Sequence, residues 1–302
     1  MIRNEGLGEK ANPRSERMKI IEYDVKYKRQ LYDLINQHNK FVPPYVEMSD
    51  TEITAILQQP CHYNDLRYPS DGGTTKIYLM VRDDVITCAA QIAFPEQDAY
   101  FYWFVVNPAY LDSQDIDMFI AKMKDLCLQN GCQTLGFNRN TFGTGWAGLP
   151  DCWEALLENV SSLGFNADDL WEIYWMDGSL PALGNLPIVS VEFEYENPQT
   201  IEAGFFIEST KIGEASIWLP SRLSESLNSV GIANLEYFEI YKKHRQKKFG
   251  QAALTAIMNK LNKIGFSKLM FWTELDNIAM QQLGIKMGFV KGPVLHWLLC
   301  EL

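Results

Sequence analysis

Hydrophobic and polar positions along this chain alternate with two periods, and these periods predict strands and helices. Runs rich in β-branched and aromatic residues indicate strands, whereas apolar residues spaced three or four apart indicate helices. In the first half, strands are predicted at residues 19–23, 76–81, 85–94, 100–106, 134–137 and 171–176. Helices are predicted there at residues 27–38, 49–57, 116–127 and 151–163.

The second half shows the same kinds of pattern in a similar order. Strands are predicted at residues 188–195, 205–208, 214–219, 234–240 and 267–273, with helices at 254–264 and 277–286. In both halves a glycine ends the longer helical pattern, at Gly131 and Gly265, and a Gly-Phe pair follows the next helix, at Gly164 and Gly288. The sequence therefore predicts two domains of one kind in tandem.

Chain length and a segment rich in Gly and Pro predict where the first domain ends and the second begins. At 302 residues the chain is longer than the size at which a single core stops growing. Gly and Pro concentrate near residues 178–187, between two strand-like segments. Residues 1–17 have no apolar run and are expected to form a disordered lead-in. We therefore predict one domain at residues 18–178 and a second at 179–302.

Composition excludes several classes of partner. No apolar run approaches the ~20 residues that would span a bilayer, so no membrane segment is expected. The net charge is −11, which argues against nucleic acid as a general partner. The six cysteines form no C-x-x-C pair, so we expect no metal site and a reducing, cytoplasmic location.

One basic segment stands out in this acidic chain. Residues 242–248 contain five Lys or Arg side chains, between the strand at 234–240 and a helix that opens near Gly250. Unpaired backbone N–H groups and the positive end of the helix dipole favour an anion at such a junction. A solvated, charged helix start is the alternative interpretation.

The same segment carries a family resemblance. Arg245-Gln246-Lys247-Lys248-Phe249-Gly250 resembles the acyl-CoA pyrophosphate loop of GNAT-type N-acetyltransferases, whose pattern is Arg/Gln-x-x-Gly-x-Gly/Ala. Lys248 stands where that pattern usually has its first Gly. The second signature of the family, an Asn, a short helix and Gly-Phe, is matched at Asn277 and Gly288-Phe289.

The resemblance implies an α/β (α+β) fold made of two tandem GNAT-like domains, each a mixed central sheet flanked by helices. It also implies acetyl-CoA as co-substrate, with the thioester carbonyl held by the backbone of residues 238–240. The expected cofactor-binding residues are Phe238, Ile240, Arg245, Gln246, Lys247, Lys248, Phe249, Gly250, Gln251 and Asn277. Few residues precede 205 for the two early helices that usually cover the acceptor side, so the first domain is expected to supply that wall.

Acetyl transfer to an amine requires a base, a polarised thioester carbonyl and a route for protonating the thiolate. Glu236 is the leading candidate base, because it lies four residues before Ile240 and is expected on the same strand face, with Glu239 opposite. The family often has a Tyr seven residues after the Asn, and Gly284 occupies that position here. Tyr241 or water is the remaining candidate acid.

The first domain lacks the basic loop. Asp112, Asp115 and Asp117 occupy the corresponding segment and would repel a pyrophosphate. A Gly-rich loop at residues 142–150 carries no cation and is interpreted as a turn. We therefore expect the first domain to be degenerate for CoA.

The sequence thus predicts an acetyl-CoA-dependent N-acetyltransferase that acts on a primary amine of a small molecule or peptide, as a monomer or homodimer. The acidic chain favours a cationic acceptor through electrostatic steering. The alternative is a non-catalytic acyl-CoA-binding protein with a regulatory or scaffold role.

Overall fold

The computed structural model describes residues 18–40, 47, 49–58, 74–95, 97–111, 114–137, 148–177, 184–197, 200–219 and 232–302. The predicted lead-in at residues 1–17 lies outside this part of the chain. So do Asp112 and all but the last three residues of the Gly-rich loop predicted at 142–150.

The described residues form strands and helices close to the predicted positions. The first half contains β1 (Met18–Glu22), η1 (Val25–Tyr27), α1 (Lys28–Asn39), α2 (Asp50–Gln58), β2 (Thr74–Arg82), β3 (Val85–Phe94), β4 (Asp98–Val106), η2 (Pro108–Tyr110), α4 (Asp115–Gln129), β5 (Thr134–Phe137), β6 (Leu149–Pro150), α5 (Glu154–Ser162) and β7 (Asn166–Asp177). The second half contains β8 (Ser190–Asn197), β9 (Thr200–Ile207), β10 (Thr210–Trp218), β11 (Ile232–Ile240), η4 (Lys242–His244), α7 (Phe249–Lys263), β12 (Lys268–Glu274), α8 (Ile278–Lys286) and β13 (Val290–Glu301).

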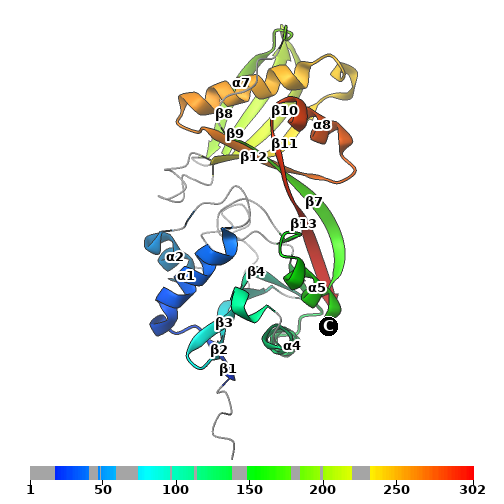
Figure 1. Cartoon of the computed structure of the whole chain (residues 1–302). Coiled ribbons are helices and arrows are strands. Elements are labelled where there is room, and N and C mark those ends of the chain that lie inside the picture. The colour runs from blue at the N-terminus through cyan, green and yellow to red at the C-terminus, as the bar shows by residue number, and fades with distance from the viewer. Residues whose placement is uncertain are drawn as a thin grey trace, which may run out of the picture.

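These strands join into one mixed sheet (Figure 1). The order across it is β1-β2-β3-β4-β5-β13-β7-β12-β11-β10-β9-β8, with β6 paired to β13. Most neighbours are antiparallel, but β4 with β5 and β11 with β12 are parallel. The predicted α/β fold class, with a mixed sheet, is confirmed.

The last strand of each half lies in the sheet of the other half. β7 ends the first half in sequence, yet it pairs with β12 and β13 of the second. β13 ends the chain and pairs with β5, β6 and β7 of the first half. Figure 1 shows these two long strands running together between the two groups of helices. Each half of the sheet is therefore completed by the other half of the sequence.

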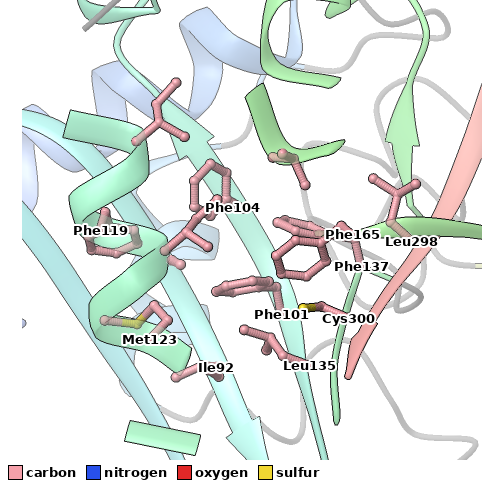
Figure 2. Packing of buried hydrophobic residues seen from close by; sticks show 14 of the residues in the cluster. Ile92, Phe101, Phe104, Phe119, Met123, Leu135, Phe137, Phe165, Leu298 and Cys300 are labelled. Atoms are coloured by element: carbon pink, nitrogen blue, oxygen red, sulfur yellow. The ribbon is translucent and has the colours of Figure 1, made fainter. Parts of the chain in front are cut away.

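Hydrophobic cores lie on both faces of the sheet. Helix α1 covers one face of β2–β4, where Leu31, Ile35 and Trp103 are buried. Helices α4 and α5 cover the opposite face, and this core includes Leu298 and Cys300 from β13 (Figure 2). A fully buried leucine side chain stabilises a fold by roughly 1.5–3 kcal/mol, so the C-terminal strand contributes directly to the first half.

The second half has its main core on the side of α7 and α8. Leu254, Ile257 and Leu261 of α7 pack there against residues of β9–β12 and against Tyr174 and Met176 of β7. Among the described residues between β7 and β11, only the strands β8, β9 and β10 are present. No helix of the described part is long and apolar enough to cross a membrane.

Because each half of the sheet contains a strand from the other half of the sequence, we predict that neither half folds stably without the other. An isolated fragment of residues 179–302 would leave the edges of β12 and β13 without β7, and exposed edges of this kind aggregate. We expect this fragment to be insoluble, whereas a chain cut at an inserted protease site between residues 177 and 184 should stay associated. Size-exclusion chromatography of both samples tests this, and a soluble, folded 179–302 monomer would contradict it.

Candidate active site

The basic segment forms a tight turn at the N-terminus of α7. Lys242, Lys243, Lys247 and Lys248 are exposed, and η4 leads from the end of β11 into the turn. The first helical N–H groups have no intrahelical acceptor, and the first bond closed onto the turn is from Ala252 N–H to the Lys248 carbonyl. Four ammonium groups and free N–H groups thus surround the positive end of one helix dipole.

Lys248 has the left-handed backbone of a glycine position. Its φ is +62°, and Gln246 has a φ of +63°. This conformation is the physical reason why glycine is usual at the position, because it costs an L-residue about 1–2 kcal/mol. The turn therefore keeps its backbone shape with a lysine in place of the glycine, and it gains an ammonium group.

Arg245 lies apart from the helix N-terminus. Its Nε donates to the Ile240 carbonyl at 2.7 Å, and its Nη2 lies 3.0 Å from a carboxylate oxygen of Glu239. Both contacts hold the guanidinium on the end of β11, where Glu239 neutralises its charge. The lysines, rather than Arg245, supply the uncompensated positive charge of the turn.

The parallel strands β11 and β12 diverge beside this turn. Their pairing runs only from Ile232 to Asn234 on β11, opposite Lys268 to Met270 on β12. Beyond Asn234 no strand in the described part of the chain pairs with the edge of β11 that faces β12, although the other edge of β11 stays paired with β10. The predicted thioester-binding residues Phe238 and Ile240 lie on this unpaired stretch.

A β-bulge changes the predicted faces of the two glutamates on β11. The pairing with β10 shifts register around Glu236, and Leu235 and Phe238, three residues apart, both pack on the α7 side. Glu236 follows Leu235 and therefore lies on the opposite face. Glu239 lies between Phe238 and Ile240, which also pack on the α7 side, so it shares the face of Glu236. The prediction that these two carboxylates lie on opposite faces is wrong.

The two segments that resemble the family signatures, the turn before α7 and the α8 region, lie next to each other. A Cβ on Gly250 would lie 3.2 Å from Leu283 of α8 and 3.7 Å from Phe238, so the start of α7 packs closely against both elements. Asn277 caps α8, its side-chain oxygen accepting from the Met280 N–H at 3.2 Å. The capping bond is a structural role for the signature Asn.

Aromatic rings from β12 and β7 lie beside Gly284, the position where the family often has a tyrosine. A Cβ on Gly284 would lie 2.7 Å from Phe271 and 3.4 Å from Tyr174, whose rings stack 5.0 Å apart. Tyr174 belongs to β7, so the first half supplies a tyrosine beside Gly284. Its hydroxyl donates to Glu172 at 2.7 Å, and Glu172 is paired with Lys291. Burial, and then the neighbouring carboxylate, raise the pKa of Tyr174.

Sequence reasoning missed Tyr174 because it lies on a strand of the other half. Tyr241, the predicted acid, lies on the β10 side instead, and its hydroxyl donates to Glu214 at 3.3 Å. The Lys211 ammonium, 2.6 Å from Glu214, lowers the pKa of that carboxyl. Tyr237 donates to Glu239, and this bond, with burial, raises the pKa of Tyr237 to about 12.

The corresponding helix start in the first half carries a buried carboxylate in place of lysines. Asp115 is fully buried in the first turn of α4 and forms an ion pair with Arg82. A negative charge in the first turn of this helix disfavours a phosphate there. Asp117 is exposed in the same turn.

A histidine lies where the strands of the first half diverge. The pairing of β4 with β5 ends at Tyr100 and Gly136. Further along β4, Val106 N–H donates to Nδ1 of the buried His38 at 3.5 Å, and the His38 ring lies 3.8 Å from Trp153. Burial lowers the pKa of His38 to about 3, so this imidazole is neutral. His38 therefore accepts from the Val106 N–H, a backbone donor that a ligand bound between the diverging strands β4 and β5 would require.

Solved structures share this arrangement over nearly the whole chain. A tandem GNAT protein from the clavulanic acid biosynthesis pathway has a TM-score of 0.64, covering 94% of this chain and 98% of its own, at 12% identity. A GCN5-related N-acetyltransferase from Sphaerobacter thermophilus has a TM-score of 0.65, covering 94% and 96%, at 10% identity. This chain has a tandem GNAT fold.

A third structure extends the tandem GNAT likeness to a larger protein. The glucosamine N-acetyltransferase region of a fungal multi-domain β-N-acetylglucosaminidase has a TM-score of 0.62 and 11% identity, and the match covers 95% of this chain and 38% of that one. No protein-family model and no curated protein sequence matches the chain. The resemblance predicted from two short motifs is thus confirmed as a likeness of fold.

The left-handed backbone at Lys248 predicts an unusual response to glycine. Lys248→Gly removes the steric cost of a positive φ, partly offset by the greater freedom of the unfolded chain, so we expect stability to rise by about 0.5–1 kcal/mol. Lys247→Gly has no positive φ to relieve and should lower stability by about 0.5–1 kcal/mol. Urea unfolding of both variants measures the difference, and equal midpoints would contradict the strained backbone.

Proposed function

We propose that this tandem GNAT protein is an acetyl-CoA-dependent N-acetyltransferase that transfers acetyl directly to a primary amine. The observation that carries the proposal is the juxtaposition in the second half of a lysine-rich helix N-terminus and diverging parallel strands. The first feature suits a pyrophosphate and the second suits the pantetheine arm with its thioester. The predicted cytoplasmic location remains part of the proposal.

Acetyl-CoA binds the second half in this proposal. The N–H groups of Phe249, Gly250 and Gln251, together with the ammonium groups of Lys247 and Lys248, hold the pyrophosphate. The unpaired edge of β11 near Phe238 and Ile240 leaves backbone N–H groups for the thioester carbonyl. A carbonyl held by such donors is stabilised most strongly when it becomes an oxyanion, which is what lowers the barrier.

Glu236 is the proposed base. It lies at the bulge on β11, two residues after the last residue paired with β12, and one of its carboxylate oxygens is buried. An incoming ammonium loses a proton to this carboxylate, directly or through one water. The amine nitrogen then bonds to the acetyl carbon as the C–S bond breaks and CoA leaves.

The thiolate has no side-chain acid at residue 284. Tyr174 lies beside that position, but its hydroxyl donates to Glu172 and its raised pKa keeps its proton. A thiol with a pKa near ~8.5 is already a fair leaving group, so water is sufficient to protonate it. We assign Tyr174 to packing between the halves and leave protonation of the thiolate to solvent.

The stoichiometry of acetyl-CoA binding tests the assignment of the two halves. Because Asp115 and His38 occupy the corresponding positions in the first half, we expect one equivalent per chain by calorimetry. The double variant Lys247→Glu with Lys248→Glu should weaken binding at least about tenfold, since it reverses charge beside the phosphates. The control, Lys19→Glu with Lys122→Glu, makes the same change in net charge at exposed sites of the first half. A second equivalent, or equal effects of both pairs, would contradict the assignment.

Glu236 tests whether the protein is an enzyme. Glu236→Gln should keep acetyl-CoA affinity and lose about 10²–10⁴-fold in turnover at neutral pH. Part of that loss should be recovered at high pH, because more of the amine is then already neutral. Thiol release with a panel of amines measures this.

Glu239→Gln is the matched control for Glu236→Gln. Glu239 is held by Arg245 and Tyr237, so its change should leave kcat, measured with both acetyl-CoA and amine saturating, nearly unaltered. Equal, small effects of both variants would assign deprotonation to solvent. No thiol release by the wild type across the panel would favour the alternative function, a non-catalytic acyl-CoA-binding protein.

A further inference from the structure

The two faces of the sheet in the second half differ in chemistry. Residues that alternate toward α7, such as Ala203, Ala215 and Leu235, are buried in its core. The residues between them lie on the other face, and carboxylates recur there on four neighbouring strands. These carboxylates are Glu192 and Glu194 of β8, Glu202 of β9, Glu214 of β10, and Glu236 and Glu239 of β11. We call this surface the acidic face.

Only part of this negative charge is neutralised. Lys211 lies 2.6 Å from Glu214, and Arg245 lies 3.0 Å from Glu239. Within the described part of the chain, Glu192, Glu194 and Glu202 have no cationic partner, and Glu202 accepts only from Ser216 Oγ at 2.6 Å. Like charges at this spacing disfavour one another, so the acidic face attracts cations.

A buried amide lies at the inner end of the acidic face. Asn234 lies between the core residues Ala233 and Leu235 and therefore points to the same face as Glu236. It is fully buried, yet among the described residues neither its side-chain oxygen nor its side-chain nitrogen has a hydrogen-bond partner. A buried amide without partners costs stability, so its retention in the core indicates a ligand that supplies them.

Two tryptophans lie in the same cross-strand row as Asn234. In register across the sheet, Trp175 of β7 lies opposite Met270 of β12, Met270 opposite Asn234, and Asn234 opposite Trp218 of β10. Trp272 follows Met270 on the same face and packs with Trp175 around Ile173. Indole faces attract ammonium groups, so aromatic residues and carboxylates on this face favour the same kind of ligand.

We propose that the acidic face binds the acceptor, and that this acceptor is a linear aliphatic polyamine with at least two ammonium groups. This inference rests on the proposed acetyl transfer. One terminal amine lies beside Asn234, whose side-chain oxygen accepts from it, at the point where β11 and β12 diverge. The remaining ammonium groups extend over β10 and β9 toward Glu202, Glu194 and Glu192.

The spacing of the strands fits such a ligand. Adjacent strands lie about 4.8 Å apart, so the distance from β11 to β8 is roughly 14 Å. An extended polyamine follows this direction and places successive charges over successive strands. The reacting ammonium gives one proton to Glu236, and its nitrogen bonds to the acetyl carbon as the C–S bond breaks. The nitrogen then loses a second proton to solvent as the amide forms, and solvent protonates the departing CoA thiolate. The other amines stay protonated and hold the chain on the carboxylates.

A kinetic comparison of two amines tests the acceptor class. Thiol release from acetyl-CoA is measured with a linear aliphatic triamine and with a monoamine of equal length. We expect the KM for the triamine to be at least about tenfold lower, and this advantage to shrink with added salt, because salt screens exposed charges. Equal KM values for both amines, with turnover present, would overturn the polyamine proposal while leaving the acetyltransferase intact.

Two variants locate the binding surface. Glu194→Gln with Glu202→Gln should raise the KM for the triamine about tenfold, leaving the KM for acetyl-CoA and kcat unchanged, since only distal ammonium groups lose partners. Glu158→Gln, an exposed carboxylate on α5, is the matched control and should change nothing. Asn234→Leu should raise the KM for the triamine without lowering the melting temperature, because a leucine needs no hydrogen bond. A destabilised Asn234→Leu variant with unchanged KM would assign Asn234 to the fold alone.

Calorimetry separates this proposal from the enzymatic one. Triamine binding to the acetyl-CoA-free protein, weakened by Glu194→Gln with Glu202→Gln, supports the acidic face even if no thiol is released. Absence of triamine binding, with acetyl transfer to other amines, overturns the acidic face as the acceptor site and leaves the acetyltransferase assignment standing.

Discussion

The antiparallel pairing of β7 with β13 is the interaction on which the rest of the structure depends. Each strand is 12 residues long, and each is the last strand of its half. Their pairing turns two sheets into one and carries Leu298 into the core of the first half and Tyr174 into that of the second. The ion pair between exposed Lys291 and buried Glu172 joins residues 119 positions apart in the sequence. The core under α4 and α5 and the core under α7 thus each contain residues of both halves, whereas the core under α1 belongs to the first half alone.

This shared architecture accounts for the unequal chemistry of the two halves. Both halves have parallel strands that diverge and a helix that starts beside the divergence. In the second half the helix start is surrounded by lysines and the edge of β11 is open. In the first half the chain supplies its own carboxylate, from Asp115, and its own imidazole, from His38, at the equivalent positions. Electrostatics and packing, rather than backbone topology, thus distinguish the two halves.

Local patterns predicted most elements, because most strands and helices have a clear period, and a glycine follows each of the helices α4, α5, α7 and α8. The tandem arrangement followed from the repeated order of those elements. The final strand was missed, since Gly292-Pro293 interrupts its pattern, and the exchange of strands was missed because β7 and β13 have similar patterns and could join either half. The faces of Glu236 and Glu239 were predicted wrongly because a bulge adds one residue to β11, and no sequence signal marks it. Lys248 was recognised as a departure from the family pattern, but only its φ shows that the turn is preserved.

The position of β13 has a consequence for synthesis of the chain. A ribosome releases the N-terminal residues first, and most multidomain proteins fold one domain at a time in that order. Here the sheet of the first half lacks the strand beside β5 until β13 has been translated. Any chain that stops short of residue 290 presents an open strand edge and an incomplete core, which are the features that chaperones and proteases recognise. Synthesis of β13 is therefore the step that allows the sheet of the first half to close, although β13 begins at Val290 and the last element of that half, β7, ends at Asp177.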